Sequence, residues 1–339
     1  MIPPSFDRVA AFAPLRVAAL RAARGHRTGR GVASFLANLE PEVLALEREL
    51  LAGAWTPRPL TTFHIREPKP RIISAAAFRD RVVHHAVCAE LDPVFEAHAD
   101  KDSYACRPGK GSHAAVLRAQ AHARHHPWFV KLDVRHFFET VPHEGLLARL
   151  APSLRDHRLH DVVLRILSVG ASSPGCGLPI GNLTSQHFGN FYLSFLDQYA
   201  RRSLRVSALV RYMDDVLWFG PDKATVRGWA TLADEWVTGE LGLTLKPEAT
   251  IVAPVHVGVP YLGFRIWPQL VRLDAARVRR LRRRLRTLAR LRERGALDDD
   301  GAQRRGASVL AWASHADTLQ LRRKTVADRL DTVNTRAEG

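Results

Sequence analysis

The sequence predicts an α+β fold in two or three interlocking lobes, on the strength of three observations. Apolar residues recur at helical spacing near both ends of the chain, and short apolar runs typical of strands lie between them. The length of 339 residues is sufficient for two or three lobes, each with its own core. No internal repeat or low-complexity linker separates the lobes, so we expect them to pack on one another.

The N-terminal region is predicted to contain two helices and then two short strands. Within residues 5–53, apolar positions recur at helical spacing, the basic and glycine-rich stretch 25–31 interrupts them, and Gly53 ends the pattern. Residues 61–74 are expected to form two strands around a turn at 67–70, because the prolines there exclude a helix. A helix follows, with its apolar face at Val82, Val83, Ala86, Val87 and Leu91.

The middle of the chain alternates between helices and strands. Residues 103–115 are expected to be a basic loop that opens a helix, 128–134 (WFVKLDV) a strand with an aspartate near its end, and 189–200 a helix. Residues 206–220 are predicted to form a hairpin with RYMDD at its tip, and 259–267 (VPYLGFRIW) a further strand.

The C-terminal part is predicted to be a separate helical piece. Asp274 can cap a helix in which Val278, Leu281, Leu285 and Leu288 recur every three or four residues. Ten arginines and one glutamate lie between positions 277 and 294, which favours contact with a phosphate backbone over a merely solvated face. The acidic run 298–300 is expected to be a loop, and 307–332 to be helical again.

The charge and cysteine content narrow the class of protein. Fifty basic against 34 acidic residues give a net charge of +16, which favours nucleic acid as a partner over solubility alone. Three dispersed cysteines without a C-x-x-C pair suggest neither a zinc site nor a disulfide framework. No apolar run reaches the ~18 residues of a membrane span, and the first residues lack the apolar core of a signal peptide. We therefore expect a cytoplasmic protein that does not associate with membranes.

Two adjacent carboxylates, Asp214 and Asp215, lie at the tip of the predicted hairpin between apolar runs. Burying carboxylates is costly unless they are hydrogen-bonded or hold a metal. Asp133 lies near the end of another apolar strand, so three carboxylates converge if the strands are neighbours. Such oxygen clusters suit Mg²⁺, and two ions ~4 Å apart can clamp the attacking and leaving oxygens of a phosphoryl transfer. The alternative is a hairpin tip whose acids simply face water.

Five motifs, in order, resemble those of reverse transcriptases. RYMDD resembles their metal-binding signature, and VKLDVRHFFETV (130–141) resembles their first aspartate motif. GLPIGNLTSQHFGNFYLSFLD (177–197) resembles the helix that holds the templating base pair. LGLTLKPEAT (241–250) and YLGF (261–264) match the next motif and the primer grip, and EPKPRIIS and FRDRVVHHAV match the fingers.

The resemblance implies the fold and the activity of an RNA-directed DNA polymerase, with template RNA, a cDNA primer and dNTPs as its partners. The fold would be a right hand with fingers, a palm made of an antiparallel sheet backed by helices, and a helical thumb. The expected divisions are an N-terminal helical extension (1–57), fingers (58–127), a palm (128–268, with a return to the fingers near 142–176) and a basic thumb (269–339).

The form of the helix motif narrows the subfamily. Group II intron and retron enzymes usually have proline after the serine of this motif, whereas this chain has IGNLTSQ at 180–186. That form resembles reverse transcriptases of diversity-generating retroelements, and EPKPRIIS, YACRPGKGSHA and WASHADT (312–318) support the same subfamily. The resemblance implies error-prone cDNA synthesis with misincorporation at template adenines, for mutagenic retrohoming. It also implies a basic, pentameric helical accessory protein, and no maturase or endonuclease domain.

The resemblance assigns roles to individual residues. Asp133, Asp214 and Asp215 would be catalytic and would hold two Mg²⁺ ions, helped by the carbonyl of Val134. The implied nucleotide-binding residues are Lys69, Arg71, His136, Phe137, Phe138, Gly181 and Gln186. The implied template and primer contacts are Arg107, Ile180, Ser185, Tyr261, Leu262 and Gly263.

Four of these positions carry specific expectations. Phe138 would lie under the nucleotide sugar and exclude a 2′-hydroxyl, whereas its neighbour Phe137 would pack in the core. Ile180 and Arg71 are the candidates for pressing on the base pair and so for setting the error rate. The position of the lysine that often protonates pyrophosphate is Ala249 here, and Lys246 is offset from it by three residues, so the general acid is left open.

Three other functions are alternatives. A stand-alone phage-defence or group II-like reverse transcriptase would keep the polymerase in a different biological setting. A basic RNA-binding protein with an inactive polymerase fold is disfavoured by the intact set Asp133, Asp214 and Asp215. An RNA-directed RNA polymerase is disfavoured by Phe138.

Overall fold

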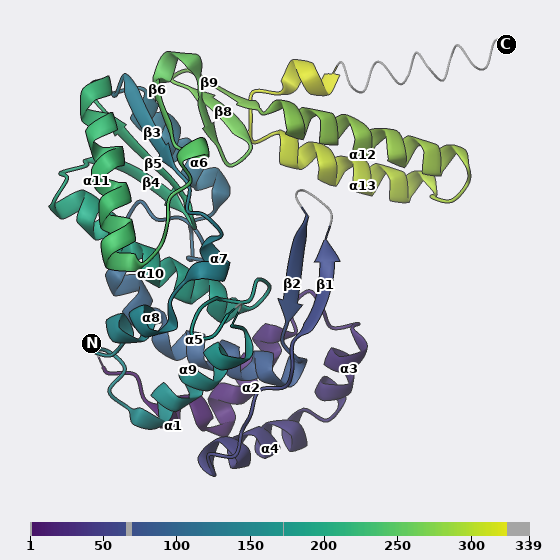
Figure 1. Ribbon diagram of the computed structural model, residues 1–339. Helices are drawn as coiled ribbons and strands as arrows, with labels where there is room; N and C mark the ends of the chain where they lie inside the picture. Colours follow the sequence, from purple (N-terminus) through teal and green to yellow (C-terminus); the bar gives the residue numbers. More distant parts are fainter. Residues whose placement is uncertain (1, 66–69, 172, 324–339) are drawn as a thin grey trace.

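The computed structural model, described for residues 2–65, 70–171 and 173–323, confirms an α+β fold and contains three antiparallel sheets (Figure 1). Strands β1 (Thr61–Ile65) and β2 (Arg71–Ala75) form a hairpin. The central sheet has the order β4-β5-β3-β6, and a three-stranded sheet has the order β7-β8-β9. The strands of these two sheets are β3 (Trp128–Leu132), β4 (Ala208–Tyr212), β5 (Asp215–Gly220), β6 (Ile251–Pro254), β7 (Val259–Tyr261), β8 (Phe264–Trp267) and β9 (Leu270–Leu273).

The N-terminal region contains four helices where two were predicted. They are α1 (Phe6–Ala10), α2 (Phe12–Ala22), α3 (Arg30–Ala37) and α4 (Leu39–Leu51), and the predicted break at 25–31 lies between α2 and α3. Two prolines explain the extra breaks. Pro14 and Pro41 lack the N–H that would bond the carbonyls of Ala10 and Ala37, and these are the last residues of α1 and α3.

The predicted helices of the middle region are confirmed, and two long ones form the centre of the molecule. Helix α5 (Phe78–His98) packs against α2 and against α10 (Leu183–Arg202), which begins six residues before the predicted start. Shorter helices connect these elements to the sheet, namely α6 (Ser112–Ala123), α7 (Phe137–Thr140), α8 (His143–Leu150) and α9 (His157–Val169).

Both faces of the central sheet are buried, which explains why its strands are mostly apolar. Val130 and Trp218 lie in a core that includes residues of α10 and of α11 (Lys223–Leu241). Phe129 and Leu217 point to the opposite face, into a second core with α6 and the β7-β8-β9 sheet. Apart from Lys131 in β3 and Arg211 in β4, the charged side chains lie where the strands begin or end. Strand β3 ends at Leu132, two residues before the predicted end, so Asp133 follows the strand directly.

The single strand predicted over 259–267 is wrong, because the chain turns back on itself in the middle of it. Strands β7 and β8 pair as a hairpin in which Tyr261 faces Phe264. The two turn residues, Leu262 and Gly263, both have positive φ, 46° and 76°, which is the requirement of the tight hairpin turn. Leucine seldom adopts this conformation, so the sequence does not announce the turn.

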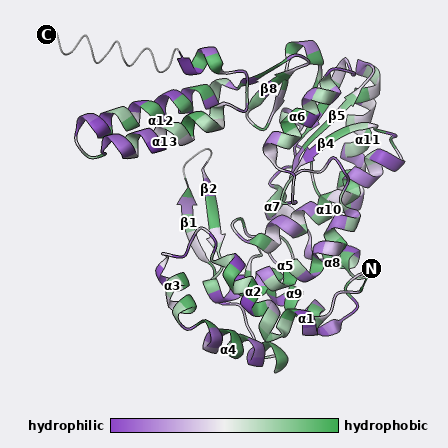
Figure 2. Ribbon diagram, turned by 180° about the vertical axis from the view of Figure 1, so that it is seen from behind, coloured by the Kyte–Doolittle hydropathy of each residue, from purple (hydrophilic) through white to green (hydrophobic). Residues whose placement is uncertain are grey.

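The C-terminal helices form an arm beside the sheets. Asp274 caps α12 (Ala275–Glu293) by accepting a hydrogen bond from the backbone N–H of Arg277, as predicted. The acidic run is not a loop, because Asp298 caps α13 (Asp299–Ala313), and Asp299 and Asp300 form its first turn, where negative charge is favourable. Figure 2 shows α12 and α13 with alternating hydrophilic and hydrophobic stripes.

The helix predicted over 307–332 is interrupted after Ala313. Residues 314–318 are not helical, residues 319–323 are helical again, and the rest of the prediction lies outside the described residues. The interruption attaches the arm to β9. The backbone N–H of Asp317 donates to the carbonyl of Val271 at 2.7 Å, and the Asp317 carboxylate accepts from the N–H of Val271 at the same distance.

The β1-β2 hairpin and the α12-α13 arm approach each other on one side of the molecule (Figure 1). Within the described ranges, no helix combines the length and the apolar character needed to cross a bilayer.

Candidate active site

The register of the central sheet brings the three predicted carboxylates together. Strands β3 and β5 pair with Leu132 opposite Val216, so Asp133 and Asp215 lie at the same edge. Asp214 lies beside them in the two-residue turn between β4 and β5, where Tyr212 faces Asp215. The turn is strained, because its first residue, Met213, has a φ of 54°.

The proximity of these carboxylates has an electrostatic consequence. The pKa of Asp214 is raised from 3.8 to about 6, first by burial and then by the negative charges of Asp215 and Asp133. The positive charge of Arg71, the first residue of β2, acts in the opposite direction on the same carboxyl. Arg71 is therefore within electrostatic range of the carboxylates, although it belongs to a different sheet.

Two lysines pair with the outer carboxylates. The Lys131 ammonium lies 3.0 Å from Asp215 Oδ1, and the Lys246 ammonium lies 2.8 Å from Asp133 Oδ1. Lys246 is also fixed through its backbone, whose N–H donates to the carbonyl of Asp133 at 2.8 Å. The offset of three residues from Ala249 thus does not keep Lys246 out of the site. Lys131 could not be singled out from the sequence, because its partner Asp215 lies on a neighbouring strand and the pairing depends on strand register.

The residues fit divalent metal ions that arrive with a substrate. Among the described residues, no three His, Cys, Asp or Glu side chains form a ready-made metal cluster. Mg²⁺ is usually bound by one or two carboxylates together with substrate phosphates, rather than by an all-protein cage. The raised pKa of Asp214, which burial and then the charges of Asp215 and Asp133 cause, means that a cation at this carboxylate would be favourable. Asp133, Asp214 and Asp215 would hold such ions, with the adjoining backbone carbonyl of Val134.

A buried arginine that the sequence analysis did not single out holds the turn in place. Arg211 and Asp197 are both fully buried and paired at 2.7 Å, which ties β4 to α10. The same guanidinium donates to Asn190 Oδ1 at 3.0 Å and to the carbonyl of Met213 at 3.3 Å. A charged residue within an otherwise apolar strand was the available signal, and its partner 14 positions earlier could not be identified from spacing.

The β1-β2 hairpin is fastened to the start of α10. The N–H of Ser74 donates to the carbonyl of Ile180 at 2.8 Å, and Asn182 bridges Ser74 and Ala76 through its side chain. Gly181 is required at this junction, because it has a φ of 120° and a Cβ would meet Ile73 Cγ2 at 2.7 Å. Lys69, the other basic residue predicted in this hairpin, lies outside the described residues.

The two phenylalanines after Asp133 have different environments. Phe137 is buried, and its ring is packed beside Gly189 of α10. Phe138 is half-buried, with its ring centroid 5.2 Å from that of Phe137. His136 is exposed, and its ring lies 3.2 Å from Glu139.

Three predicted nucleic-acid contacts are engaged inside the protein. Arg107 pairs with Glu96 and donates to two backbone carbonyls, those of Asp100 and Ser103. Ser185 is buried and donates to the carbonyl of Pro179 at 2.7 Å. Tyr261 is also buried, and its hydroxyl donates to the carbonyl of Asp215 at 3.4 Å. Tyr261 therefore connects the β7-β8 turn, which contains Leu262 and Gly263, to the carboxylates.

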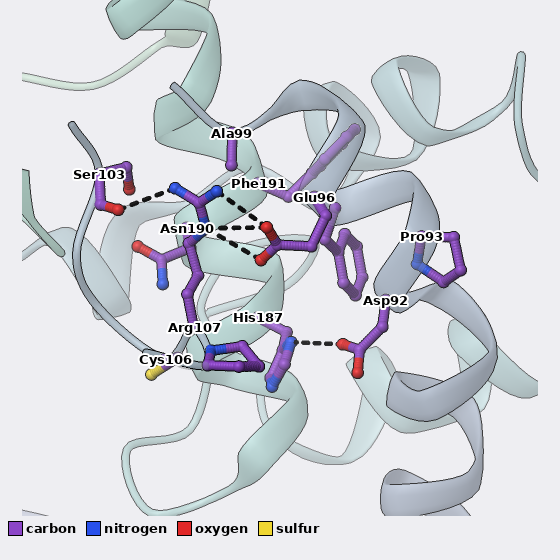
Figure 3. Close-up of a pocket in the computed structure, with 12 residues that line it drawn as sticks. Asp92, Pro93, Glu96, Ala99, Ser103, Cys106, Arg107, His187, Asn190 and Phe191 are labelled. Atoms are coloured by element: carbon purple, nitrogen blue, oxygen red, sulfur yellow. Dashed lines mark hydrogen bonds and ion pairs between the residues drawn. The ribbon is translucent and has the colours of Figure 1, made fainter. Parts of the chain in front are cut away.

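A pocket of about 680 Å³ lies between α5, α10 and the loop that contains Arg107 (Figure 3). Its polar residues are already paired, His187 with Asp92 at 3.4 Å and Arg107 with Glu96 at 2.8 Å. Cys106, which lines it, donates to Gln186 Oε1 at 3.3 Å. The pocket is thus adjacent to a predicted nucleotide contact but does not include the three carboxylates.

A second pocket, of about 300 Å³, does include two predicted nucleotide contacts, Gly181 and Gln186. Arg81, His84 and His85 of α5 line its other side. The pKa values of both histidines are lowered to about 4, mainly by burial, with Arg81 contributing. At neutral pH they are uncharged, and Arg81 supplies the positive charge of this pocket.

Residues 65–266, more than half of the chain, match the sequence model of the family described as reverse transcriptase (RNA-dependent DNA polymerase). The chain belongs to the reverse transcriptase family. The predicted polymerase class and its right-hand fold, an antiparallel sheet with helices, are thereby confirmed.

Similar proteins include several that are encoded in introns. Protein YkfC of Escherichia coli is 25% identical over 71% of this chain and 75% of its own length. The group II intron-encoded protein LtrA of Lactococcus lactis is 22% identical over 47% of this chain, and the putative COX1/OXI3 intron 1 protein of Saccharomyces cerevisiae is 24% identical over 45%. This reverse transcriptase chain spans only 28% and 20% of the lengths of those two intron proteins.

Among solved structures, telomerase from Candida albicans in complex with a fragment of telomeric RNA is similar, with a TM-score of 0.48 and 10% identity. The alignment covers 68% of this chain and 50% of the telomerase chain.

Proposed function

We propose that this reverse transcriptase extends a DNA primer on an RNA template, using two Mg²⁺ ions held by Asp133, Asp214, Asp215 and the carbonyl of Val134. The observation that supports it most is the convergence of the three carboxylates at one sheet edge, with Arg71 in electrostatic range. When bound, the metal ions activate the primer hydroxyl and stabilise the leaving pyrophosphate.

The protein's own residues would orient the nucleotide. Arg71 compensates the charge of the triphosphate, as phosphoryl transfer requires. The half-buried ring of Phe138 lies under the sugar and excludes a 2′-hydroxyl, so the product is DNA. Gly181 and Gln186 border the same small pocket, which supports their contact with the base pair.

The proposed division of the chain into fingers, palm and thumb follows its secondary-structure elements. The β1-β2 hairpin belongs to the fingers, the β4-β5-β3-β6 sheet is the palm, and the α12-α13 arm is the thumb. The template–primer duplex lies between them, against the arginines of α12. A cytoplasmic location stays a prediction.

The finer proposal is that the enzyme belongs to a diversity-generating retroelement. The motif IGNLTSQ at 180–186 supports this assignment. The assignment implies error-prone synthesis at template adenines and a basic pentameric accessory protein as partner. The alternative is a group II-like or phage-defence enzyme, and the intron-encoded relatives favour the group II-like form of it.

Primer extension with purified protein, Mg²⁺ and an RNA template tests the activity. We expect DNA synthesis by the wild type, none by Asp214→Ala, and unchanged synthesis by Asp234→Ala, which removes an exposed carboxylate of α11. Synthesis that survives Asp214→Ala would refute the assignment of the site.

Sequencing the products tests the subfamily. Errors concentrated opposite template adenines would support the retroelement, whereas accurate synthesis would favour the alternative. Ile180→Val and Arg71→Lys should change the error rate at adenine more than the overall rate. An unchanged error spectrum in both variants would contradict the role assigned to Ile180 and Arg71.

A further inference from the structure

Asp215 and Asp133, the outer carboxylates of the site, each form an ion pair with a lysine of the protein. Lys131 comes from β3 and reaches Asp215 on the neighbouring strand, whereas Lys246 comes from the segment before β6 and reaches Asp133. The two lysine side chains are only 19% and 32% exposed, so they lie within the site rather than extending into solvent. Within the described residues, Asp214 has no such lysine partner.

These two ion pairs are incompatible with metal ions on the same oxygens. A divalent cation bound to Asp133 Oδ1 or Asp215 Oδ1 would lie within a few ångströms of an ammonium group, and like charges at that distance repel strongly. Each lysine must therefore move away before its carboxylate can take a metal ion. The displaced ammonium then needs another anion, and the triphosphate of an incoming nucleotide supplies one.

We propose that Lys131 and Lys246 are exchangeable counter-ions, which compete with the metal ions for Asp215 and Asp133 and transfer to the phosphates when metal and nucleotide enter together. The inference rests on the proposed metal site. Its consequence is a coupling: the lysines weaken metal binding to the empty enzyme but not to the enzyme with nucleotide. Metal and nucleotide thereby bind as a unit.

Binding of Mn²⁺, followed by the electron paramagnetic resonance signal of the free ion, tests this without any turnover. The full chain is titrated without nucleic acid, in the absence and presence of a dNTP. Lys131→Met and Lys246→Met should each tighten Mn²⁺ binding without nucleotide by about two- to fivefold, the range expected for a partly exposed ion pair. The factor by which a dNTP increases the affinity for Mn²⁺ should be smaller in these variants than in the wild type, by a similar amount.

Lys223→Met is the matched control, because it makes the same change in charge at the far end of the sheet, beside Trp128. It should bind Mn²⁺ as the wild type does. Lys131→Arg and Lys246→Arg keep the charge and should leave the affinity near that of the wild type. If a methionine variant fails to fold, Lys131→Gln and Lys246→Gln remove the same charge and carry the same expectation.

Two kinds of failure are distinguishable. Unchanged or weaker Mn²⁺ binding in both methionine variants would overturn the counter-ion role, while the metal site would stand if Asp214→Asn still lost binding. Equal binding by the wild type and Asp214→Asn would instead refute the metal site of the proposed function. Equal tightening in Lys223→Met would show a general effect of net charge and would also overturn the proposal.

Discussion

Asp214 lies in an environment that disfavours its own charge. Burial and the two neighbouring carboxylates raise its pKa to about 6, whereas the flanking Asp133 and Asp215 each have a lysine. A group with a raised carboxyl pKa in the folded state destabilises that state once it ionises. Ionised Asp214 therefore costs stability in the metal-free protein, and this is what the proposed metal-binding role of Asp214 would explain.

Asp214→Asn should stabilise the metal-free protein at pH 7–8. Between pH 3.8 and about 6 the folded state binds more protons than the unfolded state, so the wild type loses stability as the pH rises through this window. The neutral amide avoids that loss, and a gain of roughly 1–3 kcal/mol is expected from a shift of this size. Urea unfolding in EDTA at pH 8 and at pH 4 measures it.

The gain should disappear at pH 4, where the wild-type carboxyl is protonated. Asp234→Asn is the control, because it makes the same change at an exposed position and should show no such pH dependence. A variant that is less stable than the wild type at both pH values would show that the repulsion at Asp214 is relieved by other means.

At the scale of elements, one buried ion pair connects the helix behind the sheet to the carboxylate turn. Arg211 joins Asp197 and Asn190 of α10 to the carbonyl of Met213, next to Asp214. Removing one partner leaves the other charge buried without compensation, which costs more than the pair itself contributes. The network thus has a stabilising and a positioning role.

Arg211→Met should lower the free energy of unfolding by about 3–5 kcal/mol, because Asp197 is left as an isolated buried charge. Equilibrium urea unfolding measures the loss. The double variant Arg211→Met with Asp197→Leu removes both charges and should recover most of it. A loss below about 1 kcal/mol in the single variant would mean that water enters or the structure rearranges around Asp197, so that its charge is not left isolated.

Elements were predictable from the sequence where one local signal dominates. The strands of the central sheet are buried on both faces and so are mostly apolar, which made the convergence of Asp133 with Asp214 predictable. The β7-β8 turn was missed because Leu262 adopts a positive φ that its residue type does not indicate. Lys131, Asn182 and Arg211 were missed because their partners are distant in sequence and depend on strand register.

At the scale of the whole molecule, the arm is positioned by a small attachment to the sheets. Asp317 makes two hydrogen bonds with the backbone of Val271 of β9, one through its N–H and one through its carboxylate, and the Arg277 guanidinium lies over the Phe264 ring at 4.7 Å. This attachment directs α12 toward the side on which the β1-β2 hairpin also lies (Figure 1). The segment WASHADT lies within a predicted helix. Its interruption was missed, because local periodicity does not indicate that this segment docks onto β9.

The surface of α12 is suited to a phosphate backbone along one stripe. Leu281 and Leu285 are buried on one side of the helix, whereas Arg279, Arg282 and Arg286 are exposed. At 100° per residue these three arginines fall within a sector of about 60°, whose centre lies about 110° around the helix from that of the two leucines. A duplex that contacts this stripe would release a counterion for each phosphate that an arginine neutralises.

The triple variant Arg279→Gln, Arg282→Gln and Arg286→Gln should therefore weaken binding of a template–primer duplex and reduce its salt dependence. The slope of log affinity against log salt should become shallower by about two to three, since each lost phosphate contact removes roughly 0.7–0.9. Fluorescence anisotropy over a range of KCl concentrations measures both. The control, Arg48→Gln with Arg155→Gln and Arg227→Gln, removes the same charge from exposed sites on other elements. If both triple variants change the slope equally, net charge rather than the α12 stripe governs duplex binding, and the arm has no specific role as a thumb.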